Sequence, residues 1–164
     1  MKKYYKAQYE NRSAIRSSTS EKIIYTHAVI DTYATSSQIV FASFHSRLDL
    51  AATRVAECGL GAEVTVVEVK QITAAEYKAL NAIATEEHEA FLAVKREKFF
   101  TAYPKMVEIM SHNLEFRNGF DIFTTAHLGY CIKTYGELSN RQALEVIALY
   151  EAKSYKPIME KVGA

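Results

Sequence analysis

The sequence predicts an α+β fold, in which a small N-terminal β-sheet with one packed helix is followed by a C-terminal block of about four helices. In the first 70 residues, apolar and polar side chains alternate as they do in strands. From residue 73 onward, apolar residues recur every three or four positions, as on one face of a helix. With 164 residues, 49% of them apolar, the chain is long enough to bury a core. We expect residues 1–72 and 73–164 to pack as one continuous domain.

Four segments of the N-terminal part have the residue pattern of strands. Residues 3–9 alternate loosely, residues 22–30 and 38–44 are rich in β-branched and aromatic side chains, and residues 63–70 alternate most regularly. Residues 11–20 are polar, rich in Ser and Arg, and lack regular apolar spacing. They are therefore expected to form a loop or a wide hairpin connection.

One helix is expected between the third and fourth strands, over residues 47–58. Its small and apolar residues follow the spacing of a helix face: Leu48, Ala51, Ala52, Val55 and Ala56. Gly59 and Gly61 are expected to end this helix, because glycine readily adopts the left-handed cap conformation. A helix in this place would cover one face of the sheet.

Four helices are predicted in the C-terminal part, over residues 73–100, 104–117, 120–135 and 139–153. The first and the last begin with a capping box, whose side chains satisfy free amide groups at a helix start. The second begins with a proline, which is favoured at the first position of a helix. The second and third breaks contain Gly119 and Gly136.

Composition excludes several classes of protein. No apolar run approaches the roughly 20 residues of a membrane helix, and no signal-peptide pattern follows the basic start. We therefore expect a cytoplasmic protein with no membrane partner. Cys58 and Cys131 are too few for a disulfide framework and are expected to be small buried thiols. Glu108 and His112 share a helical face, but this spacing is typical of surface pairs, so neither a metal nor a cofactor is predicted.

The net charge of +1 conceals an uneven distribution along the chain. Residues 1–22 carry six basic and two acidic side chains, whereas residues 60–97 carry four basic and seven acidic ones. A basic segment of this size can attract phosphate or an acidic partner, but by itself it does not define a nucleic-acid-binding protein.

A small anion-binding pocket is one functional hypothesis. His45 and Arg47 lie at a junction of strand and helix, and His27 lies on a neighbouring predicted strand. The structural alternative is that His27 is a hydrogen-bonded residue of the sheet and that Ser46 caps the helix. No motif for nucleophilic catalysis is present, so no catalytic residue is assigned.

Nucleic-acid binding is suggested by the basic residues Arg12, Arg16 and Lys22, since such side chains contact phosphates. Three tyrosines could stack on single-stranded bases: Tyr4, Tyr5 and Tyr25. The structural alternative is a solvated edge hairpin whose charges prevent aggregation.

The predicted helix start at residues 139–142 offers a second nucleic-acid hypothesis. Asn140 and Arg141 are of types that can read base edges. However, Ser139 and Gln142 are already explained by capping, and the helix has no net positive charge. An antiparallel helical hairpin is therefore the favoured interpretation.

Two stretches resemble small proteins encoded by bacteriophages and related mobile elements. The first consists of residues 24–29 together with residues 46–51, and the second consists of residues 135–142. The second is similar to a short helix–turn–helix that ends in a Gly-x-Leu-Ser-x-x-Gln signature, with Arg141 where a lysine is usual. The resemblance covers about a third of the chain; it implies a phage-type origin and carries over no activity.

The leading hypothesis is a non-enzymatic phage-type accessory protein in the host cytoplasm, which binds a host protein or assembles with copies of itself. The alternative is a nucleic-acid-binding protein that uses residues 11–22 and the helix start at 139–142. An enzyme that uses His27, His45 and Arg47 ranks third.

Overall fold

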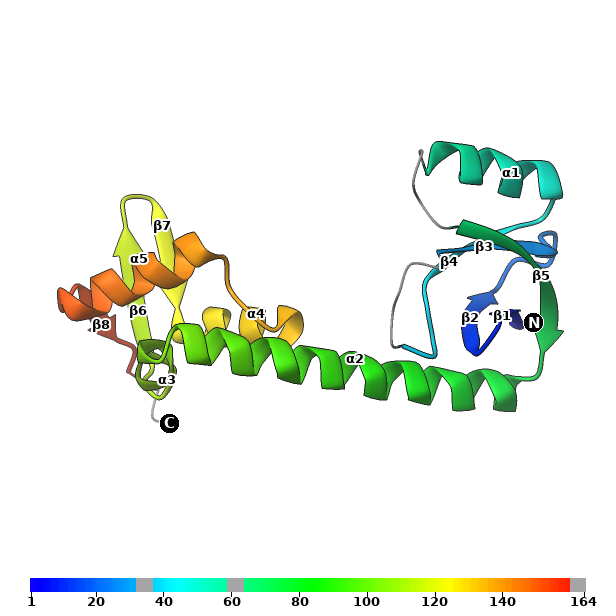
Figure 1. Cartoon of the computed structure of the whole chain (residues 1–164). Helices are drawn as coiled ribbons and strands as arrows, with labels where there is room; N and C mark the ends of the chain where they lie inside the picture. The colour runs from blue at the N-terminus through cyan, green and yellow to red at the C-terminus, as the bar shows by residue number, and fades with distance from the viewer. Residues whose placement is uncertain (32–36, 59–63, 160–164) are drawn as a thin grey trace. The chain divides into compact units, whose positions relative to one another are not determined.

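A computed structural model describes residues 1–31, 37–58 and 64–159 of the chain (Figure 1). It confirms the α+β class, with an N-terminal sheet that carries one helix and a mainly helical C-terminal part. The chain forms two compact units, Met1–His88 and Glu89–Ala164. Their boundary falls inside helix α2 (Ala74–Ala102) and not at residue 72, where the strand pattern of the sequence ends. No helix of the described ranges is long and apolar enough to cross a bilayer.

The first unit contains a five-stranded sheet in the order β2-β1-β5-β3-β4, with every neighbouring pair antiparallel. Its strands are β1 (Lys3–Tyr9), β2 (Arg12–Ser18), β3 (His27–Asp31), β4 (Ala42–His45) and β5 (Val64–Ile72).

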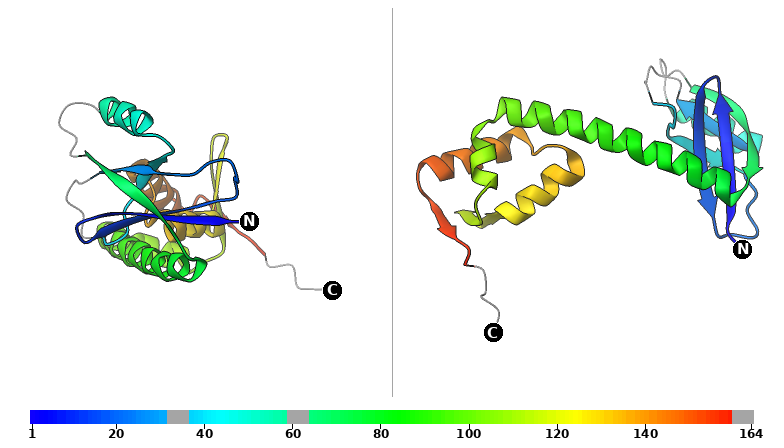
Figure 2. Two further views of the ribbon diagram at one scale, coloured as in Figure 1. Left: turned by 90° about the vertical axis from the view of Figure 1, so that its right-hand side faces the viewer. Right: turned by 90° about the horizontal axis from the view of Figure 1, so that it is seen from below.

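The sheet curls until its two edges meet (Figure 2). Ser13 of β2 forms a parallel bridge with Ile39, just ahead of β4. The Ser13 amide donates to the Gln38 carbonyl at 2.7 Å, and the Val40 amide donates to the Ser13 carbonyl at 2.9 Å. The Glu87 carboxylate of α2 accepts from the amides of Gln38 and Ile39. Closure satisfies backbone groups that an open edge would leave free.

The alternation of side chains separates an inner from an outer face of this sheet. The inner face forms one buried cluster: Tyr5, Ala7, Ala14, Ala28, Ile30 and Phe44. On the outer face, helix α1 (Leu48–Glu57) packs on β3, β4 and β5 and buries Val29 and Ala51. The first turns of α2 lie against β1, where the rings of Tyr77 and Tyr4 are 4.8 Å apart (Figure 1).

The prediction of a loop over residues 11–20 is wrong, because β2 occupies most of that segment. Every residue of β2 pairs with a residue of β1, from Arg12 opposite Tyr9 to Ser18 opposite Lys3. Pairing with β1 therefore stabilises a strand here, although the composition of the segment is polar. Strands β3 and β4 begin later than the predicted 22–30 and 38–44.

Helix α1 confirms the predicted helix, and it ends at Glu57 with Cys58 as its C-cap residue. The predicted stop at Gly59 and Gly61 lies outside the described residues.

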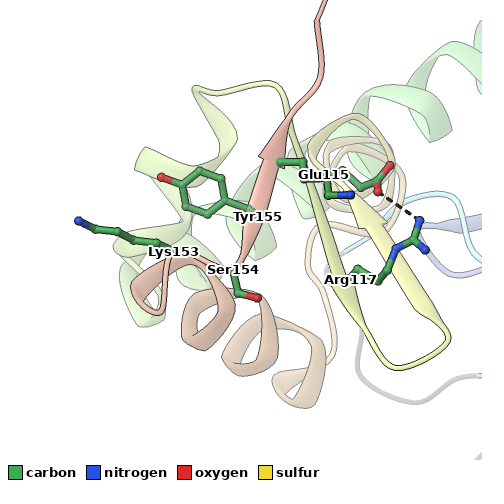
Figure 3. A pocket seen from close by; sticks show the side chains of 6 residues that line it. Glu115, Arg117, Lys153, Ser154 and Tyr155 are labelled. Atoms are coloured by element: carbon green, nitrogen blue, oxygen red, sulfur yellow. Dashed lines mark hydrogen bonds and ion pairs between the residues drawn. The ribbon is translucent and has the colours of Figure 1, made fainter.

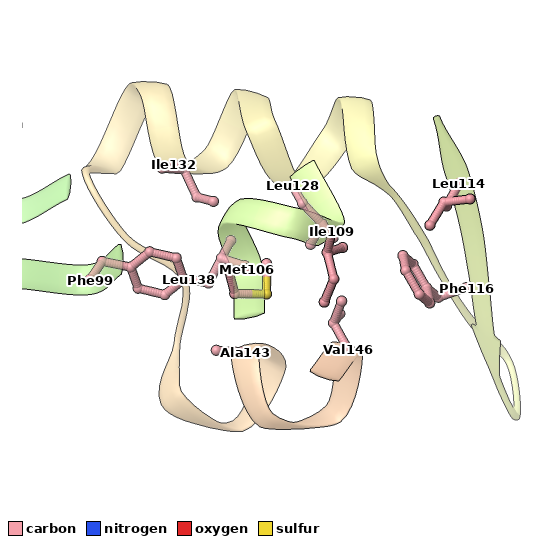
Figure 4. Close-up of a cluster of buried hydrophobic side chains, with 10 residues drawn as sticks. All are labelled: Phe99, Met106, Ile109, Leu114, Phe116, Leu128, Ile132, Leu138, Ala143 and Val146. Carbon is pink, nitrogen blue, oxygen red and sulfur yellow. The ribbon is translucent and has the colours of Figure 1, made fainter. Parts of the chain in front are cut away.

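The second unit contains the end of α2 and three further helices packed on a three-stranded antiparallel sheet in the order β7-β6-β8. These elements are α3 (Lys105–Met110), β6 (Leu114–Asn118), β7 (Asp121–Thr124), α4 (Thr125–Tyr135), α5 (Asn140–Glu151) and β8 (Tyr155–Pro157). Side chains from every helix and from β6 meet in one buried cluster (Figure 4): Phe99, Met106, Ile109, Leu114, Phe116, Leu128, Ile132, Leu138, Ala143 and Val146.

This sheet corrects the predicted helices over residues 104–117 and 120–135, which are shorter than expected. The first ends at Met110 and the second begins at Thr125, with a β-hairpin between them. Gly119, with φ 58°, occupies the two-residue turn of that hairpin. Leu114 and Phe116 are buried with the period of two that is typical of a strand. A glycine at the first position of a two-residue turn is a hairpin signal, and the sequence prediction treated it only as a helix break.

Both predicted capping boxes cap helices in the structure. The Thr73 hydroxyl accepts from the Glu76 amide at 3.1 Å, and the Ser139 hydroxyl accepts from the Gln142 amide at 3.2 Å. A four-residue connection joins α4 to α5, and it begins with Gly136 at φ 82°.

Candidate functional site

Arg16 projects from a paired strand and not from the predicted loop. Its guanidinium carbon lies 4.8 Å from the centre of the Tyr25 ring. That ring in turn packs edge-on against Tyr5 and Phe44, at centroid distances of 5.1 and 6.0 Å. Arg16 is therefore held at the end of the inner core. Arg12 lies four residues away on β2, opposite Tyr9, near the hairpin turn.

Two lysines lie at the same end of the first unit as Arg16. The Lys3 ammonium donates to the Glu21 carbonyl at 3.0 Å, and Lys22 follows directly with an exposed side chain. Lys3 is opposite Ser18 and Arg16 is opposite Tyr5, which places Lys3 and Arg16 diagonally on neighbouring strands. We refer to Lys3, Arg16 and Lys22 as the basic end.

The three tyrosines do not present free rings for base stacking as predicted. Tyr5 is 1% exposed, which contradicts the stacking role proposed for it. Tyr4 packs against Tyr77, and Tyr25 lies beneath Arg16. Their rings serve the packing of the unit itself.

The structure brings His27 and His45 together. They are directly opposite on β3 and β4, and Glu68 of β5 is opposite His27 on its other side, so the three form one row across the outer face. His27 Nδ1 is 2.9 Å from the Thr26 hydroxyl, and His45 Nε2 is 3.0 Å from the Ser43 hydroxyl. The histidines are thus hydrogen-bonded residues of the sheet. Nowhere in the described ranges are three or more His, Cys, Asp or Glu placed to hold a metal.

Arg47 does not complete an anion pocket with these histidines. Its guanidinium forms a two-point ion pair with Asp49, in which Nε lies 2.9 Å from Oδ1. The hydrogen bond from Arg47 lowers the pKa of the Asp49 carboxyl. Ser46 is not the helix cap that we expected, because Arg47 occupies the N-cap position and its side chain makes no capping hydrogen bond.

The predicted base-reading residues of α5 are largely engaged within their own unit. The Asn140 side-chain oxygen accepts from the Tyr103 hydroxyl, and the Gln142 side-chain oxygen accepts from the Ser139 hydroxyl at 2.9 Å. Arg141 is exposed. A single exposed arginine gives this helix start little capacity to read base edges.

A shallow groove of about 230 Å³ lies beside β8 in the second unit (Figure 3). It is lined by Glu115, Arg117, Lys153, Ser154, Tyr155 and Lys156. Arg117 is paired with Glu115 at 3.5 Å, and its side chain and that of Lys153 point in opposite directions. Arg117 and Lys153 therefore do not converge on one ligand. No pattern in the sequence predicts this groove, because the segments of β6 and β8 are not predicted as strands.

A cluster of interacting charged groups joins α3 to α5. Glu108 accepts from the Tyr150 hydroxyl at 2.8 Å and from the Lys105 ammonium at 2.7 Å. The Lys105 hydrogen bond is the main cause of the lowered pKa of Glu108, and the Glu108 hydrogen bond raises the pKa values of both Lys105 and Tyr150. Glu108 is thus committed to a contact between helices, and it does not form a metal site with His112.

Two phenylalanines expose their whole side chains: Phe41, which is 99% exposed, and Phe120, whose value is 105%. Phe120 lies at the tip of the β6–β7 hairpin, and Ile122 on the same hairpin is 49% exposed. The hairpin is held beside its turn, because the Asn118 side-chain amide donates to the carboxylate of Glu145 on α5. We refer to Phe120 and Ile122 as the hairpin tip.

Comparison with known proteins assigns no relative to the chain. No family model matches it, and neither a curated protein nor a solved structure is similar enough to count as a match. The arguments for function therefore depend on the geometry of three places: the basic end, the row formed by His27, His45 and Glu68, and the hairpin tip.

Proposed function

We propose that the protein is a non-enzymatic accessory protein of the phage type, which acts in the host cytoplasm through protein–protein contact. The contact surface is the hairpin tip of the second unit. The observation that carries this proposal is the full exposure of Phe120 on a hairpin that is anchored to α5. Large exposed apolar side chains on an ordered element are typical of interaction sites.

The geometry of the hairpin reduces the entropic cost of binding. Asn118 is directly opposite Asp121, so only Gly119 and Phe120 form the turn. The bond from Asn118 to Glu145 restrains the hairpin before a partner arrives. Less ordering is then needed when the partner binds. Full burial of a phenylalanine contributes about 1.5–3 kcal/mol.

The open edge of β7 supplies polar contacts next to this aromatic anchor. β7 is the outer strand of the three-stranded sheet, and it pairs with β6 on one side only. An extended segment of a partner can add to such an edge through backbone hydrogen bonds. The partner that fits is a protein with an exposed strand and an apolar pocket for Phe120, either a host protein or a second copy of this chain.

Site-specific photo-crosslinking tests the proposal. A benzoylphenylalanine at position 120 is expected to give a discrete adduct in the producing cell, and mass spectrometry of the adduct distinguishes a second copy from a host protein. The same residue at position 41 is the matched control, since Phe41 is equally exposed but lies in the first unit. The absence of an adduct at 120, or equal adducts at both positions, would contradict the proposal.

A further inference from the structure

We infer that the basic end, formed by Lys3, Arg16 and Lys22, binds the phosphodiester backbone of nucleic acid without reading its sequence. This inference concerns the first unit and is independent of the protein contact proposed for the hairpin tip.

Arg16 is oriented for phosphate binding before any ligand arrives. Its guanidinium lies on one face of the Tyr25 ring, and Tyr5 and Phe44 hold that ring edge-on. A guanidinium held over an aromatic ring keeps N–H groups that do not face the ring, and these remain available to a ligand. Those groups match two oxygens of one phosphate.

Lys3 adds a second cation at a suitable spacing. Lys3 on β1 is paired with Ser18 on β2, and Ser18 lies two residues beyond Arg16 on that strand. Diagonal neighbours of this kind have Cβ atoms about 7–8 Å apart. One proton of the Lys3 ammonium is bonded to the Glu21 carbonyl, which fixes the position of the charge and leaves two further donors.

The basic end keeps a net positive charge. Lys22 is exposed, and within the described ranges it forms no ion pair. The nearest carboxylate in sequence, Glu21, points its oxygen at the ammonium of Met1 at 3.3 Å. Three side-chain cations therefore remain beside the ion pair of Met1 with Glu21, which favours an anionic ligand.

The ligand is a phosphate backbone and not a set of bases. The rings of Tyr4, Tyr5 and Tyr25 are engaged in packing, so they do not offer the stacking surfaces of a single-strand-binding protein. The cations of the basic end lie on two neighbouring strands and on the segment that follows β2: Lys3 on β1, Arg16 on β2 and Lys22 after it. Contacts to phosphate alone give binding that is weak, independent of sequence and sensitive to salt.

Fluorescence anisotropy on the full chain tests this inference with labelled 20-nucleotide strands of oligo(dT) and of mixed sequence. Both strands are expected to bind with equal affinity. Three phosphate contacts predict that log K falls against log salt with a slope of about −2. Lys22→Glu, at an exposed position, should lower the affinity for both strands equally and make the slope shallower by about 1.

Arg16→Gln is the second variant, because it removes the charge from the stacked position. Lys98→Gln is the matched control, since Lys98 is an exposed lysine of the second unit. It should leave the affinity unchanged, and thermal melting of each variant tests whether it is folded. If Arg16→Gln does not fold, Lys22→Glu decides the question alone.

Three results would overturn the inference: no binding at 25 mM salt, binding that Lys22→Glu leaves unchanged, or a marked preference for one strand. Inorganic phosphate and chloride are each titrated into the complex with the labelled strand, at the same ionic strength. The comparison distinguishes a site for the nucleic-acid backbone from a site for free phosphate. Equal displacement by the two salts supports the backbone of nucleic acid. Selective displacement by phosphate would instead show a site for the free ion.

Discussion

Two structural features require glycine at position 136. It ends α4 with φ 82°, a conformation that other residues adopt only at a cost. A Cβ atom at this position would also lie 2.6 Å from Cβ of Lys95 on α2, which is closer than van der Waals contact allows. Tight packing and backbone conformation thus impose the same residue.

We therefore predict that Gly136→Ala lowers the free energy of unfolding by about 2–4 kcal/mol, since the left-handed conformation and the overpacking each contribute. Gly119→Ala is the control, because Gly119 has φ 58° but open space around it. It should cost only about 1 kcal/mol. Urea denaturation of both variants gives the comparison, and equal losses would show that the contact with Lys95 is unimportant.

Lys153 adopts the same left-handed backbone conformation, although it is not a glycine. It follows the C-cap of α5 with φ 55°. The Ser154 amide donates to the Leu149 carbonyl at 2.8 Å, and the Lys153 amide donates to the Tyr150 carbonyl at 3.0 Å. These two bonds define a Schellman motif, in which glycine is the usual residue at this position. The predicted helix end at residue 153 lies two residues beyond the observed end of α5 at Glu151.

At the scale of elements, α3 and α5 are joined by polar contacts at the surface as well as by the core. Met106 and Ile109 of α3 are buried together with Val146 of α5. Outside this core, Glu108 links Lys105 to Tyr150, and the Tyr150 ring stacks on Tyr155 at 5.3 Å.

The lowered pKa of Glu108 predicts a pH dependence of stability. Because its pKa in the folded state is below that of an unfolded glutamate, about 4.3, its contribution is present above that pH. The contribution is lost as the pH falls through the lower folded value. Glu108→Gln should therefore flatten the decline in stability between about pH 5 and pH 3.

The measurement is urea denaturation at several pH values. Glu97→Gln is the control, because Glu97 is an exposed glutamate on α2. The control should keep the decline of the wild-type protein. A Glu108→Gln variant with the same decline as the control would contradict the assigned role.

At the scale of the whole molecule, two separate cores stabilise the chain. Within the described ranges no buried residue belongs to both clusters, and each cluster lies in one of the two units. Ile30 is fully buried in the first cluster and Ile109 in the second. Helix α2 crosses the boundary between the units.

We predict that Ile30→Val and Ile109→Val each cost about 1 kcal/mol, in the unit that contains the residue. Hydrogen exchange followed by mass spectrometry measures the effect for each unit separately. Ile30→Val should speed the exchange of slow amides in the first unit and leave those of β6 and α5 unchanged, and Ile109→Val should do the reverse. Faster exchange in both units for either variant would show a single cooperative core.

The sequence by itself determined the features that depend on neighbours along the chain. Helix caps at Thr73 and Ser139 and the helix at 48–57 follow from hydrogen bonds and side-chain spacing within a few residues. The α+β class follows from the same local periodicity.

Only the tertiary structure decided which strands pair and which charged groups meet. β2 is a strand because β1 lies beside it, and the three strands of the second unit form only together. Of the candidate site residues, Arg16 and Lys22 lie together with Lys3, and the Asn140 side chain is bonded to Tyr103. Such contacts join residues far apart in the sequence, so no local pattern specifies them.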